Sequence, residues 1–273
     1  MAQPECSLLD DIGENAKALW LSAFNVDNLT WIRYAGFRFH PTSFQVCFME
    51  IVSGVHLISG TIVNCFLIVD ADGLTLIDTG LPNNAKKVFA ALTALDKRPT
   101  DLRRILITHS DGDHVGCLAE LSAASGARVY ASGVEAEAIA DGRASRELKT
   151  RGLQRFLLGL LRPMFRARPA RVDEVLVDGQ VLPVLGGLRV VETPGHTPGH
   201  LSFFSPSTGV LFGGDSMVSG SGGLRVSRGM NTWNEDVAKE SVRKQAALGA
   251  KIVCVGHGPI VRDASEKFPS SVF

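Results

Sequence analysis

The sequence predicts an α/β fold in which strands alternate with helices in both halves of the chain. From about residue 45 onward, short runs rich in Val, Ile, Leu and Phe are broken by glycine and aspartate, a pattern typical of strands. Segments with helical spacing of apolar residues lie between several of these runs. The same alternation returns after Pro169. These observations favour an α/β sandwich over an all-β barrel.

The expected elements can be followed in order along the chain. Apolar runs predict strands at residues 44–52, 54–60, 64–73, 74–80, 103–109, 126–132, 174–184, 186–195, 200–209, 210–217 and 251–258. Apolar spacing predicts helices at residues 82–96, 115–125, 134–142 and about 234–248. Residues 218–229 are glycine-rich and are expected to form a loop, and the last dozen residues a polar tail or helix. Both halves therefore carry similar units, which suggests a duplicated sandwich.

Two segments differ in texture from the rest. Residues 1–44 are interpreted as an N-terminal extension, with helical spacing between residues 7 and 24, and residues 45–273 as one catalytic domain. Residues 143–171 carry nine Lys or Arg side chains, one acid and several large apolar residues, as in a basic amphipathic helix. The preferred interpretation is a helical lid or flank whose arginines are solvated. A surface that meets a membrane or an anionic ligand is the alternative.

Composition limits the classes of function. The 273 residues contain 28 basic and 28 acidic side chains, so a strong general binder of polyanions such as nucleic acid is not expected. No apolar run is long enough to span a membrane, and the start of the chain lacks the features of a secretory signal. The five cysteines show no CxxC pair. We therefore expect a cytoplasmic protein without disulfides, without membrane insertion and with a small-molecule substrate; a homodimer is compatible with these features.

Histidine and aspartate residues gather where apolar runs end. THSDGDHVG (108–116) follows one strand, TPGHTPGH (193–200) follows another, and FGGDS and VCVGHG supply Asp215 and His257 after two more. Imidazole and carboxylate groups hold zinc, manganese or iron. Capping by aspartate explains any single fragment, but not all four together. The four fragments indicate a metal site.

These fragments, together with LIDTG (76–80), resemble the metallo-β-lactamase superfamily over about residues 50–260. The resemblance implies a four-layer αββα sandwich with two divalent metal ions at one edge. It implies that His109 and His196 hold the first ion, that Asp113, His114 and His257 hold the second, and that Asp215 bridges them. His200 and Asp78 are then supporting residues rather than ligands.

One position departs from the family pattern. The family reads HxHxDH, whereas this chain has Asp111 in place of the middle histidine. We expect Asp111 to bind the first ion, which would make that site more negative and favour harder ions such as manganese or iron. Alternatively, Asp111 points away and the enzyme works with one ion.

The predicted activity is that of a metallo-hydrolase of the lactonase, esterase or β-lactamase kind, in which a metal-bound hydroxide attacks a small ester, lactone or amide. Zinc is the expected ion, with iron and manganese as alternatives, and Asp113 is expected to orient the nucleophile and take its proton. An iron-dependent dioxygenase of the persulfide type and a non-catalytic ligand-binding protein are the rival hypotheses. The sequence leaves the physiological substrate, the role of residues 1–44 and the oligomeric state open.

Overall fold

The computed structural model describes residues 48–60, 62–147, 166–221 and 223–273. Within it, Phe48–Phe273 form one compact unit. The predicted N-terminal extension (1–44) and the centre of the basic segment (143–171) lie outside the described residues, and these two predictions stay as they are.

The first sheet comes from the N-terminal half of the described chain. Its strands follow one another in chain order, antiparallel from β1 to β4 and parallel from β4 to β7. They are β1 (Phe48–Val52), β2 (Val55–Ser59), β3 (Asn64–Asp70), β4 (Gly73–Ile77), β5 (Leu102–Leu106), β6 (Arg128–Ala131) and β7 (Glu174–Val175). The parallel part needs crossover helices, which are α2 (Ala85–Ala94), α3 (Leu118–Ser125) and α4 (Gly133–Ala140).

The second sheet comes from the C-terminal half. Its order is β15-β14-β11-β10-β9-β8, and the β11–β14 pair is parallel while the others are antiparallel. The strands are β8 (Val181–Leu182), β9 (Leu188–Glu192), β10 (Leu201–Ser205), β11 (Val210–Gly214), β14 (Ile252–Val255) and β15 (Val261–Arg262). Helix α6 (Glu235–Ala246) connects the two parallel strands by way of a small hairpin.

The glycine-rich stretch after β11 is a hairpin rather than the expected loop. Strand β12 (Met217–Gly220) pairs with β13 (Gly223–Val226), because apolar side chains such as Met217 and Leu224 are buried against α6 and the second sheet. Short 3-10 turns, η1 (Pro99–Asp101), η3 (Gly229–Asn231), η4 (Ala264–Glu266) and η5 (Ser270–Val272), complete the described elements. The chain end is therefore a folded tail.

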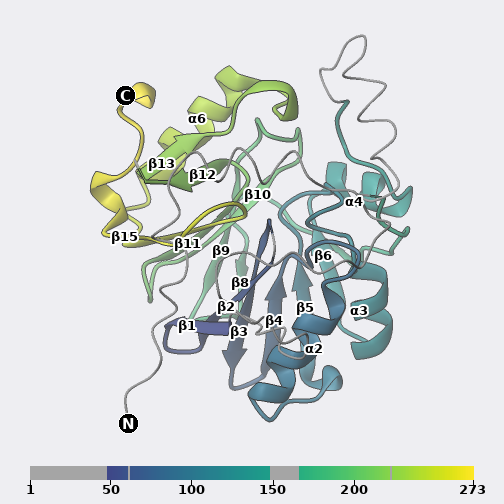
Figure 1. The fold of residues 1–273 in the computed structure, drawn as a ribbon. Helices are drawn as coiled ribbons and strands as arrows, with labels where there is room; N and C mark the ends of the chain where they lie inside the picture. Colours follow the sequence, from purple (N-terminus) through teal and green to yellow (C-terminus); the bar gives the residue numbers. More distant parts are fainter. Residues whose placement is uncertain (1–47, 61, 148–165, 222) are drawn as a thin grey trace, which may run out of the picture. The chain divides into compact units, whose positions relative to one another are not determined.

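The two sheets pack face to face and helices cover their outer faces, so the expected αββα order of layers is confirmed (Figure 1). Alternation along the strands shows the packing. Phe203 and Phe212 belong to the core between the sheets, where Phe212 lies 5.4 Å from Phe66 between ring centroids. Their neighbours Phe204 and Leu211 belong to the core beneath α6. Strands of the second sheet are thus apolar on both faces because both faces are covered.

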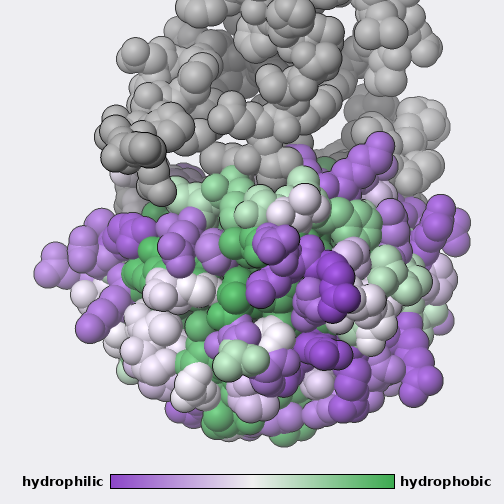
Figure 2. Space-filling model, turned by 90° about the horizontal axis from the view of Figure 1, so that it is seen from below, coloured by the Kyte–Doolittle hydropathy of each residue, from purple (hydrophilic) through white to green (hydrophobic). Residues whose placement is uncertain are grey.

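The end of the sandwich away from the C-termini of β4 and β5 has a mixed surface. Figure 2 shows apolar side chains in a band between charged ones on this face. Apolar surface of this kind is common on folded proteins.

Among the described residues, no helix combines the length and the apolar character needed to cross a membrane.

Candidate metal centre

The predicted ligands lie together although the sequence spreads them over about 150 positions. His109, Asp111, Asp113 and His114 lie in the loop between β5 and α3, and His196 lies in the loop between β9 and β10. Asp215 follows β11, and His257 follows β14. Because β11 and β14 are parallel neighbours, Asp215 and His257 emerge at the same edge. The structure brings all seven residues to one site.

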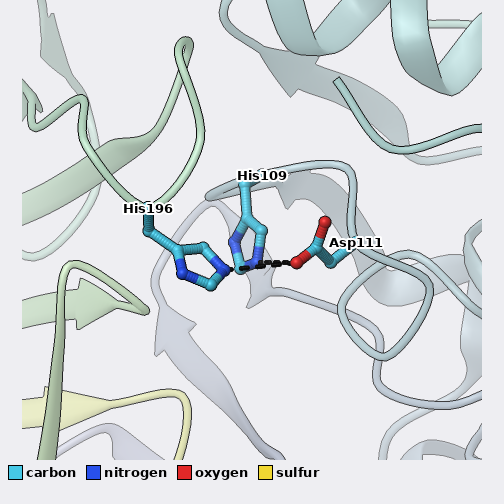
Figure 3. A group of neighbouring side chains, drawn as sticks. All are labelled: His109, Asp111 and His196. Atoms are coloured by element: carbon cyan, nitrogen blue, oxygen red, sulfur yellow. Dashed lines mark hydrogen bonds and ion pairs between the residues drawn. The ribbon is translucent and has the colours of Figure 1, made fainter. Parts of the chain in front are cut away.

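The seven residues form two groups around one aspartate. We call His109, Asp111 and His196 the first donor group, and Asp113, His114 and His257 the second donor group. In the first, two rings and a carboxylate from two separate loops converge (Figure 3). Asp215 lies between the groups, since its Oδ1 is 3.4 Å from His114 Nε2 and its Oδ2 is 3.6 Å from His196 Nε2.

The spacing of the donor atoms fits metal coordination. Zinc bonds of 2.0–2.2 Å in tetrahedral geometry place neighbouring ligand atoms about 3.3–3.6 Å apart. Asp111 Oδ2 lies 3.5 Å from His109 Nε2 and 3.2 Å from His196 Nε2. His257 Nε2 lies 3.3 Å from Asp113 Oδ2 and 3.1 Å from Asp215 Oδ2. In addition, His109 Nε2, His114 Nε2 and Asp215 Oδ1 are buried without a hydrogen-bond partner among the described residues. A cation would satisfy these atoms.

Each histidine is oriented from behind by a contact to its Nδ1 atom. The partners are Thr108 Oγ1 for His109 at 2.9 Å, Asp78 Oδ2 for His114 at 2.8 Å, Ser227 Oγ for His196 at 3.0 Å and the Ile62 carbonyl for His257. Such contacts fix the ring and turn Nε2 toward the centre, as supporting residues of metal sites do.

Asp78 has the supporting position that the sequence predicts for it. It sits just after β4 in the left-handed region, with φ of 57°, which aspartate tolerates better than most residues. Its carboxylate accepts hydrogen bonds from Thr108 N at 2.9 Å and Thr108 Oγ1 at 2.8 Å while it contacts His114. It therefore ties β4 to the ligand loop.

A glycine keeps space open beside the centre. A Cβ atom at Gly256 would lie 2.1 Å from Asp215 Oδ1 and 2.7 Å from His114 Cε1. Both contacts are too short for any side chain, so only glycine lets β14 approach the ligands this closely.

The electrostatics of the two groups differ. Burial opposes charge on His114, but Asp215 and Asp78 outweigh it and raise its pKa well above the usual value. Burial also opposes charge on His257, yet hydrogen bonds to Asp113 and Asp215 raise its pKa to about 10. In the first group, burial lowers the pKa of His196. Without metal, the second group therefore holds protons at neutral pH, whereas His196 is neutral.

The carboxylates of the centre are ionised. Burial would raise the pKa of Asp215, but His114 and His257 lower it well below the usual value. Burial would also raise the pKa of Asp111, but the contacts with His109 and His196 and the charge of Arg146 lower it well below the usual value. Ionised carboxylates are the form that binds cations.

Asp111 points into the centre and is held there by an arginine that the sequence interpretation placed in solvent. Arg146 Nη1 donates to Asp111 Oδ1 at 2.9 Å and Nη2 donates to Asp111 Oδ2 at 2.7 Å. Its side chain is only 2% exposed. The expectation of solvated arginines in the basic segment is therefore wrong for Arg146, and the expected excess of negative charge at Asp111 is offset by this guanidinium. The ion pair is long-range in sequence, so spacing alone could not reveal it.

Glu135 is a second residue that the sequence reading missed. It is fully buried and accepts hydrogen bonds from Ser110 N, Ser145 Oγ, Thr197 Oγ1 and Gly199 N. It joins the two ligand loops to the residue before Arg146. The sequence signal for Glu135 is an acidic residue among the apolar residues of the helix predicted at 134–142.

The remaining polar candidates have supporting contacts. His200, expected to be structural, is buried and accepts a hydrogen bond from Asp215 N at 3.0 Å, which positions that aspartate. The Cys117 thiol, buried at the start of α3, donates to the Thr79 carbonyl at 2.7 Å, and burial raises its pKa to about 12. This agrees with packing of Cys117 rather than metal binding.

Comparison with known proteins agrees with this architecture. A protein called YobT from Bacillus subtilis is 30% identical over 77% of this chain and 89% of its own length. A hydroxyacylglutathione hydrolase from Cereibacter sphaeroides is 31% identical over 61% of this chain, which spans 52% of that enzyme. The structure of a metallo-β-lactamase with a HARLDQ motif from Cronobacter sakazakii superposes with a TM-score of 0.61, at 27% identity over 77% of this chain and 78% of that one.

The sequence model of the metallo-beta-lactamase superfamily matches residues 58–257 of this chain. That range contains every predicted ligand, from His109 to His257. The αββα sandwich and the two donor groups agree with this match. The chain therefore belongs to the metallo-β-lactamase superfamily.

Proposed function

We propose that this protein is a metal-dependent hydrolase that cleaves a small ester, thioester, lactone or amide. The two donor groups joined by Asp215 support this proposal most strongly. Relatives named as hydroxyacylglutathione hydrolases point toward acyl compounds as substrates. Because the chain spans about half of those enzymes, their own substrate is carried over only at the level of the acyl group.

The proposed ligand set consists of the residues that the family resemblance implies, with Asp111 added where the family has a histidine. His109, Asp111 and His196 would hold one ion, Asp113, His114 and His257 the other, and Asp215 would contact both. Zinc suits this mixture of imidazole and carboxylate, with iron and manganese as alternatives. When bound, such ions activate a water molecule as nucleophile and polarise the substrate carbonyl group.

The side chains of the protein supply positioning and proton transfer. Burial would raise the pKa of Asp113, but its hydrogen bond to His257 and the charge of His114 lower it, so its carboxylate is ionised. Asp113 Oδ2 faces the centre at 3.3 Å from His257 Nε2. We assign to Asp113 the orientation of the attacking water and the acceptance of its proton.

The test is metal analysis of protein purified without added metal, combined with a panel of lactones, esters, thioesters and β-lactams. Two zinc ions per chain with hydrolysis of one class support the proposal. An Asp113→Asn variant should lose at least about 100-fold in kcat. One iron with oxygen uptake would favour the dioxygenase hypothesis, and a protein without metal or turnover under any loading would favour a binding protein.

A further inference from the structure

The first donor group contains a fixed positive charge that belongs to the protein. Arg146 Nη2 lies 2.7 Å from Asp111 Oδ2 and 3.2 Å from His196 Nε2, so one nitrogen contacts two of the three donor atoms. The Nδ1 atom of His196 contacts Ser227 Oγ, and its Nε2 atom faces Arg146. The guanidinium therefore uses the same atoms that a metal ion would use.

Arg146 is held firmly in this position. Its Nε donates to the Asn231 carbonyl at 3.0 Å, and both Nη atoms donate to Asp111. The preceding residue is anchored too, because Ser145 N donates to Ser110 Oγ and Ser145 Oγ donates to Glu135. Since the Arg146 side chain is 2% exposed, water screens its charge poorly.

The second donor group has no such cation. Among the described residues, Asp113, His114 and His257 make their ion pairs only with one another, with Asp215 and with Asp78. Asp215 is shared by both groups. A metal ion in the second group also has Asp113 and, behind His114, Asp78 nearby, whereas a metal ion in the first group meets a guanidinium that pairs with Asp111. Two cations about 4 Å apart inside a protein repel each other strongly enough to weaken metal binding by more than a factor of about ten.

We propose that Arg146 makes the first donor group a weak, exchangeable metal site and leaves the second group as the tight one. This inference rests on the proposed function, because it assumes that both groups bind metal. Arg146 acts here as a positioning and charge-setting residue. The two Nη atoms of Arg146 hold Asp111 in the centre, and the charge of Arg146 lowers the affinity of the first donor group for cations.

The test is titration of the metal-free protein with zinc, using calorimetry and a competing chelator. The wild type should bind zinc in two steps at least about tenfold apart in Kd. His196→Gln should remove the weaker step and keep the tighter one. Arg146→Gln should tighten the weaker step by at least about tenfold and leave the tighter one unchanged.

Matched variants separate charge from folding. Arg143→Gln removes a neighbouring arginine whose ion pair with Asp141 is exposed, and it should leave both steps unchanged. Arg146→Lys keeps the charge and should keep the weak step weak. If Arg146→Gln does not fold, the pair Asp111→Asn and Asp111→Asn/Arg146→Gln serves instead, and the double variant should bind the weaker ion more tightly.

The outcomes are distinct. If the Kd of the weaker step is the same with and without Arg146, the role of Arg146 is overturned while the metal centre stands. The same holds if Arg143→Gln tightens the weaker step as much as Arg146→Gln does. Failure of every protein, the wild type included, to bind zinc, manganese or iron would overturn the proposed function itself.

Discussion

The two donor groups contain similar residues, but the negative charges of their carboxylates are balanced in different ways. Asp113, His114 and His257 are surrounded by carboxylates, and protons on His114 and His257 balance these when no metal is bound. In the first group a permanent guanidinium balances Asp111, and His196 is neutral. Protons leave when a metal ion arrives, whereas an arginine cannot lose its charge. From this comparison we expect that nearby cations, as well as ligand types, determine how strongly each group binds metal.

The largest expected effect comes from the residue that both groups share. Asp215→Asn should weaken zinc binding at both groups by at least about 100-fold, because Asp215 contacts His114, His196 and His257. Metal content after dialysis against a chelator measures this. Asp178→Asn, which removes an exposed carboxylate paired with Lys244, is the control. Loss of only one of the two ions would contradict a shared role for Asp215.

The next prediction makes the two groups more alike. Asp111→His restores the family motif but leaves Arg146 buried without its partner, so it should destabilise the metal-free protein by about 3–5 kcal/mol. Asp111→His/Arg146→Gln removes the unpaired charge and should recover most of that loss. Urea unfolding of the metal-free proteins measures both. A single variant as stable as the wild type would show that the ion pair adds nothing to folding.

A change behind the second group should affect that group most. Asp78→Asn weakens the contact that orients His114, and the tighter zinc step should weaken by about 10–100-fold. The weaker step should change less, because Asp78 reaches His109 only through Thr108. Zinc titration checks this, with Asp72→Asn on an exposed loop as the control. Equal weakening of both steps would mean that Asp78 supports the whole loop rather than His114.

A final prediction concerns the dependence of stability on pH. The pKa of His257 is about 10 in the folded, metal-free protein and about 6.5 when unfolded. Its ion pairs therefore stabilise fully below about pH 6.5, and this contribution is lost as the pH rises through about 10. Thermal unfolding of the metal-free protein between pH 7 and 10 should show a fall that His257→Gln reduces.

His196→Gln is the matched control for that measurement. Because the pKa of His196 is lowered, the ring is neutral in both the folded and the unfolded protein above pH 7, and the slope should not change. An equal reduction of the slope in both variants would contradict the difference between the groups.

Much of the fold could be predicted from local sequence. The helices at Ala85–Ala94 and Glu235–Ala246 lie where the apolar spacing places them, and Asn234 caps the second through hydrogen bonds to Asp236 N and Val237 N. The hairpin at Met217–Val226 was predicted as a loop, since its many glycines hid the alternation of its apolar residues. Its burial depends on α6, which lies further along the chain.

The sequence by itself determined the candidate donor residues, because histidine and aspartate follow several apolar runs and capping does not explain all of these fragments together. It also determined the layers, since periods of strand and helix are local properties of the chain. Only the tertiary structure decided the surroundings of Asp111. The guanidinium that holds it comes from 35 positions away, and a contact over that distance depends on how loops pack rather than on any spacing. We therefore infer that any difference in metal affinity between the two donor groups depends on that packing.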